Sequence, residues 1–211
     1  MPVEKLPRRT DSALTRERIV TAAEDVVRRF GPDKATVVDV ARALGVSHAA
    51  VYRHVATKAE LTDLVVARWA EATMPSLRAI AAARGPAPQR LRGLVDALVA
   101  VKRRRAADDP ELFSAYRMLA TAAESVVAAH VDELASLIAT VIRAGVEDGT
   151  FRPVDPVVAG RSVLIATSRF HHPAHAAEWA DPGIDAAYDG VWQLLMDGLC
   201  VAKARPGVRT S

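Results

Sequence analysis

The sequence lacks three features that mark exported, membrane-bound or disulfide-linked proteins. Cys200 is the single cysteine among 211 residues, so the chain cannot form an intrachain disulfide or a multi-cysteine metal site. No apolar run approaches the ~20 uninterrupted residues that a membrane span needs. The opening segment, residues 1–12, carries basic side chains without the apolar stretch of a secretion signal. These absences predict a cytoplasmic protein without a membrane partner.

Aromatic residues and strand-forming patterns are also scarce. Aromatics make up 5% of the chain, and it has no run of alternating β-branched residues flanking an Asn-Gly or Asp-Gly turn. Half of the residues are hydrophobic and a quarter are charged, which is a globular composition rich in helix-favouring alanine and leucine. The sequence therefore predicts an all-α fold. The net charge of +3 is compatible with a nucleic-acid partner without demanding one.

The spacing of apolar residues predicts about nine helices. The first helix has an apolar face that includes Phe30, and the fourth opens with a capping box of Thr57 and Glu60, then kinks or stops near Pro75. A later helix is expected to end at the basic run 102–105, where the helix dipole favours positive charge. The expected divisions are a flexible basic arm at 1–12, a three-helix domain at 13–58, a larger helical domain at 59–203 and a flexible tail at 204–211.

Residues 37–54 form the most informative segment. A short helix follows Thr36, Gly45 can adopt the left-handed backbone of a tight turn, and a third helix begins after Ser47 and ends near His54. The apolar residues expected between these two helices are Val40, Leu44, Val46 and Val51. The pattern is typical of a helix-turn-helix, in which the second helix presents its N-terminal residues to the major groove of DNA.

The segment 45–61, GVSHAAVYRHVATKAEL, closely resembles the DNA-binding segment of the TetR (tetracycline-repressor) family of bacterial transcriptional regulators. The resemblance covers about a quarter of the chain and extends back through Ile19, Ala22, Ala23, Phe30, Gly31 and Thr36. Several family members have phenylalanine at the position of Val55, but valine also occurs there, so the departure is minor. The resemblance implies an N-terminal helix-turn-helix DNA-binding domain followed by a C-terminal helical ligand-binding and dimerisation domain, without enzymatic activity or a cofactor.

The resemblance also implies roles for residues around the second helix of the motif. The phosphate contacts of double-stranded DNA are expected from Thr36, Tyr52, His54 and Lys58. The base contacts are expected early in the recognition helix, from His48 at a base edge and from Ala49 and Ala50 at a thymine methyl group. Ser47, the cap of this helix, is also expected to bind DNA. For Arg53 two contacts stay open, one with a guanine base and one with a phosphate. The arm with Arg8 and Arg9 enters the minor groove or stays a solvated tail.

For the second domain, the resemblance implies a ligand pocket, a homodimer interface and a small-molecule inducer that releases a repressor from a palindromic operator. The candidate pocket residues are Trp69, Phe113, Tyr116, Arg117, His130, Arg169 and Phe170. The candidate interface residues are Leu164, Tyr188, Val191, Trp192 and Leu195, with Val163 and Ile165 beside them. Each pocket candidate is more often a core or surface residue than a ligand contact, and several of the interface candidates must fill the subunit's own core.

The alternative is an all-helical enzyme or metal-binding protein that uses His171, His172 and His175, with Glu178 as a further metal ligand. Pro173 argues against a continuous helix that would align two of these histidines. The histidines would otherwise cap helix ends or line the pocket. The enzyme interpretation lacks a Gly-rich phosphate loop, a Gly-x-Ser-x-Gly elbow and a His-Glu-x-x-His motif. A purely protein-binding adaptor would leave the DNA-facing residues unexplained.

Overall fold

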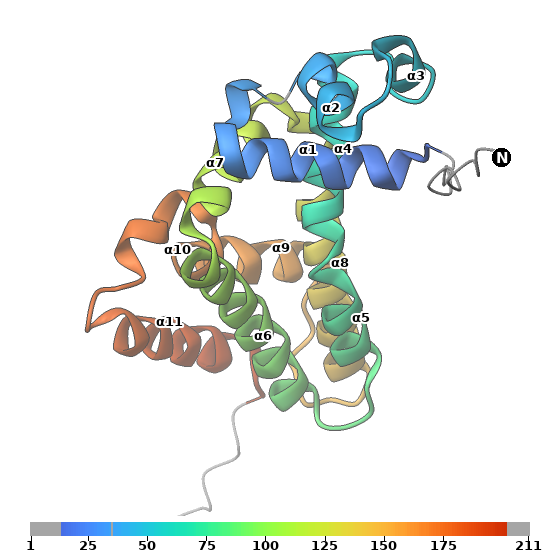
Figure 1. The fold of residues 1–211 in the computed structure, drawn as a ribbon. Coiled ribbons are helices and arrows are strands. Elements are labelled where there is room, and N and C mark those ends of the chain that lie inside the picture. Colours follow the sequence, from blue (N-terminus) through green and yellow to red (C-terminus); the bar gives the residue numbers. More distant parts are fainter. Residues whose placement is uncertain (1–13, 35, 202–211) are drawn as a thin grey trace, which may run out of the picture. The chain divides into compact units, whose positions relative to one another are not determined.

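The structure, a computed structural model, describes residues 14–34 and 36–201 and confirms the all-α fold (Figure 1). These residues form eleven α-helices, two short 3-10 helices and an isolated β-bridge between Phe151 and Cys200. They divide into two compact units, one up to Val65 and the other from Val66 onward. The expected arm at 1–12 and tail at 204–211 lie outside the described residues.

The first unit is a small three-helix arrangement closed by the start of a fourth helix. Its elements are α1 (Arg16–Phe30), η1 (Pro32–Lys34), α2 (Val37–Leu44), α3 (His48–Tyr52) and the first half of α4 (Lys58–Glu71). Each helix begins where the sequence supplies a cap: the side chains of Thr15, Thr36 and Ser47 each accept a hydrogen bond from a backbone N–H three residues on.

The apolar stripe of α1 builds the core of this unit as the spacing predicts, with one exception. Ile19 and Ala23 are fully buried, and Val40 of α2 and Val51 of α3 are buried with them. Phe30 lies on the same stripe but is 66% exposed, because it occupies the last turn of α1, where no side chain covers it. The apolar spacing predicts which face of a helix is apolar, but not how far along the helix other residues bury that face.

The second unit is built around a layer of three neighbouring helices, α5, α6 and α8, which lie side by side in Figure 1. Its elements after α4 are α5 (Met74–Ala82), α6 (Ala87–Asp108), α7 (Pro110–Ala122), α8 (Glu124–Glu147), α9 (Pro156–Ala166), α10 (Ser168–His171), η2 (Pro173–Glu178) and α11 (Ile184–Leu199). Asp109 caps α7 and Asp155 caps α9. Each is followed by a proline, whose missing N–H costs nothing in the first turn, where backbone N–H groups have no partner within the helix.

A glycine lets α9 pack closely against α8. A Cβ atom at Gly160 would lie 2.8 Å from the carbonyl oxygen of Ala135 and 2.9 Å from the backbone nitrogen of Ala139. Gly145 of α8 similarly leaves room for the ring of Phe151, which is 1% exposed. The close contacts of α9 and Phe151 with α8 cover one side of the core, where Ile138, Val141 and Ile142 of α8 are buried.

The structure has two more α-helices than expected, and both arise from local breaks. The expected fourth helix stops at Glu71, and α5 begins at Met74 with Pro75 in its first turn. The apolar segment 156–171, which reads as one helix in the sequence, is divided at Thr167 into α9 and the short α10.

The expectation that a helix ends at the run 102–105 was wrong. Helix α6 continues to Asp108, because Asp109 and Pro110 supply the break by capping the next helix. The run therefore lies inside α6, and Lys102 is only 5% exposed.

By length and composition α8 is the one described helix that could cross a membrane. It carries acidic residues at 132 and 133 and packs on α5, α6, α7 and α9, so it is the central core helix of the second unit. The core helix of a globular unit passes the same length and composition test.

Candidate functional site

The turn between α2 and α3 has the geometry that a helix-turn-helix requires. Gly45 adopts a left-handed backbone with φ 67° and ψ 30°. Its N–H donates to the carbonyl of Arg42 at 3.2 Å, and the N–H of Val46 donates to the carbonyl of Ala41 at 3.0 Å. This pair of hydrogen bonds is a Schellman motif, which satisfies the last carbonyls of α2 and turns the chain sharply.

Helix α3 is buried against the first unit on one side and exposed on the other. Val51 on its inner side and Val55 just after its end are fully buried, whereas Leu44 and Val46 of the turn are half-buried. Ser47 caps the helix by accepting from the N–H of Ala50 at 3.2 Å. The buried valines hold α3 against the unit, so the opposite side of the helix is free for a partner.

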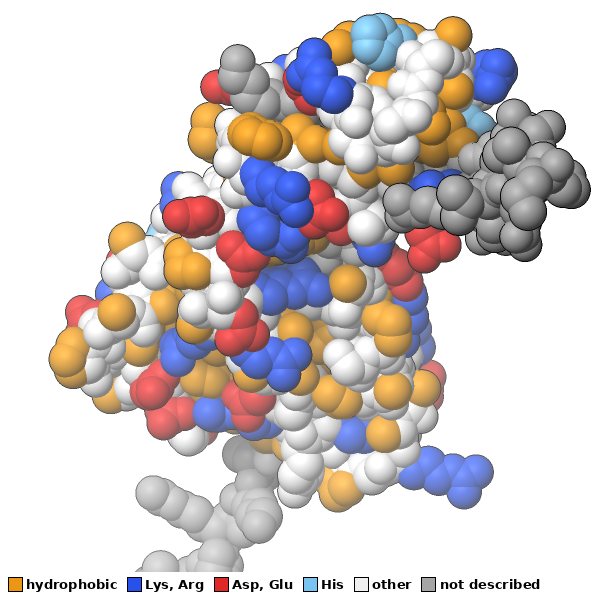
Figure 2. Space-filling model, in the orientation of Figure 1, with side chains coloured by type: hydrophobic (Ala, Val, Ile, Leu, Met, Phe, Trp, Pro, Cys, Tyr) orange, Lys and Arg blue, Asp and Glu red, His pale blue; other side chains and the backbone are white. Residues whose placement is uncertain are grey.

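Four candidate DNA-contacting residues lie on this open side of α3 and in the turn after it. His48, Ala49 and Arg53 are exposed, and the side chain of Tyr52 is 48% exposed. The exposure of Tyr52 excludes a core role for this tyrosine. Figure 2 shows histidine and basic side chains at the surface of the first unit. The helix ends at Tyr52, and Arg53 and His54 form the turn that follows.

The remaining candidates flank α3. Lys58 is exposed at the start of α4, and its Nζ lies 3.5 Å from the carbonyl oxygen of Asp33. The hydroxyl of Thr36 is half-buried and bonded to Asp39, so it already serves as the cap of α2. His54 is half-buried. Lys58 is thus the more accessible anion contact, and it lies at a helix N-terminus, where the dipole also favours an anion.

An ion pair connects the start of α1 to this region, and sequence reasoning missed it. Arg16 forms an ion pair with Glu60, and its Nε donates to the backbone carbonyl of His54 at 2.9 Å. Glu60 also accepts from the N–H of Ala56 at 2.7 Å, while its own N–H donates to the hydroxyl of Thr57 at 3.0 Å. The expected capping box is therefore present, but the carboxylate of Glu60 accepts from the N–H of Ala56 and not from that of the cap residue Thr57. Pairs 38 and 44 residues apart leave no signal in local spacing.

In the second unit, three of the candidate pocket residues form an aromatic cluster. The rings of Trp69 and Tyr116 stack with centroids 4.3 Å apart, and Phe113 lies 6.0 Å from Trp69. Trp179, which sequence reasoning missed, meets Phe113 at 5.9 Å and donates its indole N–H to the carbonyl of Arg169. The cluster gathers side chains from α4, α7 and the segment after η2.

A group of cationic and imidazole side chains lies beside this cluster. Arg105 stacks 4.9 Å above the ring of Trp69 and donates to the carbonyl of the same residue. Burial and then the charge of Arg105 lower the pKa of Lys102 to about 8. Burial and then the charge of Lys102 lower the pKa of His130 to about 4. The same two causes lower the pKa of His171 to about 4.

The other candidate pocket residues lie apart from this group. Arg117 is exposed on α7, and Arg169 is exposed and paired with Glu178 at 2.7 Å. Phe170 is 1% exposed and packs edge-on against Tyr188 in the core. Tyr188 donates its hydroxyl to Asp96 at 2.7 Å, and burial together with this bond raises the pKa of the tyrosine.

The three histidines of the alternative interpretation do different things. His171 is buried beside the hydroxyl of Thr167, whereas His175 pairs with Glu178 at 2.7 Å. His172 accepts from the N–H of Ala174 and thereby caps η2, which is the helix-end role weighed for this cluster. Within residues 14–34 and 36–201, no group of three His, Cys, Asp or Glu side chains is arranged to hold a metal ion.

The candidate interface residues divide between the core and the surface. Leu164, Tyr188 and Trp192 fill the core of the second unit, whereas Val191 and Leu195 are half-buried. The apolar side chains that are more than half exposed on α9 and α11 are instead Val157, Val158, Ile165 and Leu194.

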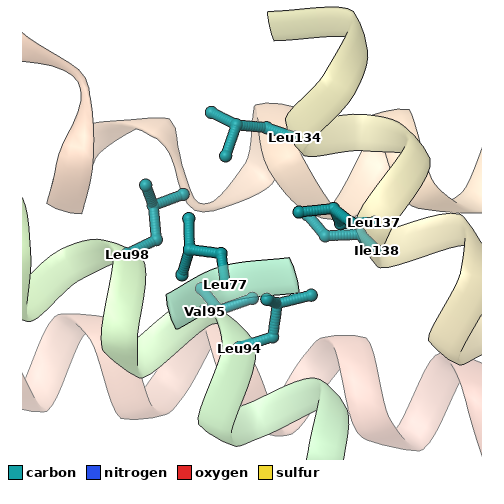
Figure 3. Close-up of a pocket in the computed structure, with 7 residues that line it drawn as sticks. All are labelled: Leu77, Leu94, Val95, Leu98, Leu134, Leu137 and Ile138. Atoms are coloured by element: carbon teal, nitrogen blue, oxygen red, sulfur yellow. The ribbon is translucent and has the colours of Figure 1, made fainter. Parts of the chain in front are cut away.

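A narrow cavity of about 10 Å³ lies among α5, α6 and α8. Figure 3 shows the seven side chains that line it: Leu77, Leu94, Val95, Leu98, Leu134, Leu137 and Ile138. All seven are aliphatic, and the space holds no more than about one water molecule.

Two family models match the chain over complementary regions. The model described as "Bacterial regulatory proteins, tetR family" matches residues 19–65, which include the helix-turn-helix. The model described as "Tetracyclin repressor-like, C-terminal domain" matches residues 87–192 in the second unit. A comparison with curated proteins gives no match.

Solved structures with the same fold come from several microbes. A TetR transcription regulator from Haloarcula marismortui matches with a TM-score of 0.68 and 21% identity, covering 88% of this chain and 97% of that one. SmeT, the repressor of the Stenotrophomonas maltophilia multidrug efflux pump SmeDEF, matches with a TM-score of 0.67 and 18% identity, covering 95% and 98%. FadR from Bacillus subtilis, in complex with stearoyl-CoA, matches with a TM-score of 0.61 and 13% identity, covering 87% and 99%.

Proposed function

The chain belongs to the tetracycline-repressor family of bacterial regulatory proteins, and we propose that it is a repressor that binds a palindromic operator as a homodimer and is released by a small-molecule inducer. The open side of α3 carries this proposal. His48, Ala49 and Tyr52 are exposed on this helix and Arg53 is exposed in the turn after it, and two buried valines hold this segment in place.

The proposed division of labour at the DNA follows from the position of each group. Residues at the start of a recognition helix reach base edges, so His48 bonds a base and Ala49 contacts a thymine methyl group. Lys58 and Tyr52 bind phosphates and fix the register of the helix. Arg53, in the turn after α3, suits a phosphate better than a base because it lies past the end of the helix.

A homodimer is proposed because one five-residue recognition helix covers only a few base pairs. The exposed apolar residues of α9 and α11, with Ile165 and Leu194 as their largest members, are the proposed contact with the second subunit. Replacing Ile165 by Asp should convert the dimer to a monomer in analytical ultracentrifugation. The matched control is Ser114→Asp, which adds the same charge at an exposed position of α7, outside the proposed contact.

Release by a small molecule is supported by two of the structural neighbours. SmeT is the repressor of a multidrug efflux pump, and FadR from B. subtilis was solved with stearoyl-CoA. In the proposed mechanism the inducer binds the second unit in a conformation whose two recognition helices no longer fit successive major grooves. The operator then loses affinity by the difference in binding free energy between the two conformations.

The experiment that tests this function is selection of random duplex DNA by the purified protein, followed by affinity measurements against salt. We expect an inverted repeat, with an affinity that falls steeply as salt rises because phosphate contacts release counterions. Weak binding without sequence preference would contradict the proposal if mass spectrometry of the same sample finds no bound small molecule. If a small molecule is found, the selection is repeated after it has been removed.

A further inference from the structure

Lys102 is a buried cation without a counter-ion. It lies in the C-terminal third of α6, is 5% exposed, and within the described chain makes no hydrogen bond or ion pair. Burying an ammonium group without a partner is costly, and proteins seldom do so without a function for the charge. An uncompensated buried cation is the feature expected of a site whose partner is an anion from outside.

A second polar group at the same place also has no partner. The Nε2 atom of His130, on α8, is buried and makes no hydrogen bond. Lys102 and His130 are close enough for the charge of the lysine to depress the pKa of the imidazole. An anion between them would accept hydrogen bonds from the ammonium and from the imidazole in its Nε2–H tautomer, which gives the buried Nε2 atom of His130 a partner.

Lys102 and Arg105 are cations at this position, whereas His130 and His171, with pKa values of about 4, are neutral at pH 7. Arg105 on α6 and His171 on α10 both interact electrostatically with Lys102, as does His172 before η2. The carboxylate on this side is Glu71 of α4, and Arg78 already holds it through two hydrogen bonds of 2.6 and 2.9 Å. The local field therefore favours an anion over a cation or a neutral molecule.

Next to the two donors, the space between α6 and α8 is purely aliphatic. Lys102 stands one helical turn beyond Leu98, and His130 one turn before Leu134, and both leucines line the cavity of Figure 3. The space between α6 and α8 therefore has a polar end at Lys102 and His130 and an apolar end at the leucines. A ligand that matches both ends has one anionic group and a hydrocarbon body, because a sugar or nucleotide would leave polar groups facing leucines.

We propose that the inducer is an amphipathic organic carboxylate, with its carboxylate bound by Lys102 and His130 and its hydrocarbon part inserted between α6 and α8. This inference rests on the proposed function, because it assigns a chemical class to the inducer. The cavity of about 10 Å³ is too small for a hydrocarbon chain, so the ligand enters only if the leucine side chains separate. Binding therefore changes the packing of α6 against α8.

The test is isothermal titration of the full-length protein at pH 7 with octanoate, and with octanamide, which has the same chain without the charge. We expect octanoate to bind at least about tenfold more tightly than octanamide, because only the carboxylate forms a charge-assisted hydrogen bond between two ions with Lys102. In Lys102→Met this preference should disappear. Arg104→Met, which removes an exposed cation two residues away on α6, should retain it. His130→Phe provides a second variant, which should weaken octanoate binding more than octanamide binding, because the hydrogen bond to the carboxylate is charge-assisted.

Equal affinity for octanoate and octanamide, or no binding of either by a well-folded wild-type protein, would overturn the carboxylate proposal. Retention of the octanoate preference in Lys102→Met would also overturn it. These titrations contain no DNA, so they are independent of the proposed repressor function. Octanoate that binds through Lys102 but leaves the operator complex intact would uphold the site and contradict release by the inducer.

Discussion

The side chain of Arg16 donates a hydrogen bond from its Nε atom to the backbone carbonyl of His54 at 2.9 Å. The first residue of α1 thereby holds the chain just after the recognition helix. The same guanidinium pairs with Glu60, which in turn accepts from the N–H of Ala56. This network connects α1 to the segment that carries the proposed phosphate contacts.

Replacing Arg16 by Met should weaken operator binding by about three- to tenfold, because the turn after α3 loses a positioning hydrogen bond. The melting temperature should change little, since both partners of the ion pair are partly exposed. The measurement is fluorescence anisotropy with a labelled operator duplex. Arg29→Met removes the same charge from the other end of α1, and an equal loss of affinity in that control would mean that only net charge matters.

Gly45 should tolerate asparagine better than alanine. A Cβ atom at this position meets no atom within 4 Å, so the cost of substitution comes from the left-handed backbone alone. We expect Gly45→Ala to lower the free energy of unfolding by about 1 kcal/mol and Gly45→Asn by roughly half of that. Urea denaturation of the three proteins measures both differences. Identical costs for the two substitutions would contradict the assignment of the turn geometry.

Gly160 should tolerate no side chain. The added methyl group of Gly160→Ala would meet backbone atoms of α8 below 3.0 Å, and backbone cannot move aside cheaply. The expected loss in unfolding free energy is about 1–3 kcal/mol. Gly93→Ala in α6 is the matched control, because a Cβ atom there meets nothing within 4 Å and alanine favours helix. An unchanged stability of Gly160→Ala would show that α9 packs less closely on α8.

Lys102 should make stability depend on alkaline pH. Its pKa of about 8 in the folded chain lies below the ordinary 10.5, so the unfolded state holds this proton more strongly. The folded protein is therefore penalised below pH 8 and gains stability as the pH rises from 8 to 10.5. Lys102→Met should be more stable than the wild type at pH 7 by about 1–3 kcal/mol, and this difference should shrink at pH 10.

Chemical denaturation at the two pH values measures this difference. The exposed Arg104→Met should show no pH-dependent gain. A Lys102→Met protein that is less stable than the wild type at pH 7 would mean that the ammonium group has a favourable partner in the folded chain.

The predictable parts of this protein are those fixed by neighbouring residues. Ser47 and Gly45 determine the start of α3 and the turn before it through their own backbone and side-chain preferences, so the helix-turn-helix could be located in advance. Asp109 and Pro110 were equally local signals for the end of α6, but the basic run before them suggested an earlier end.

The parts that could not be predicted depend on packing between distant segments. A lysine in a basic run is usually solvated, and Lys102 is buried only because α6 lies against α8. Tyr188 and Trp192 fit a core and an interface equally well by sequence, and the structure places them in the core. The contact between Arg16 and His54 likewise requires the three-dimensional fold.

The central claim is that the open side of α3 binds operator DNA, and Tyr52→Ala tests it most directly. The side chain is half exposed and outside the core, so the variant should keep its melting temperature and lose about tenfold or more in affinity for the selected duplex. Met118→Ala shortens a similarly exposed side chain in the second unit and should leave the affinity unchanged. Undiminished binding by a well-folded Tyr52→Ala protein would contradict the placement of the recognition helix.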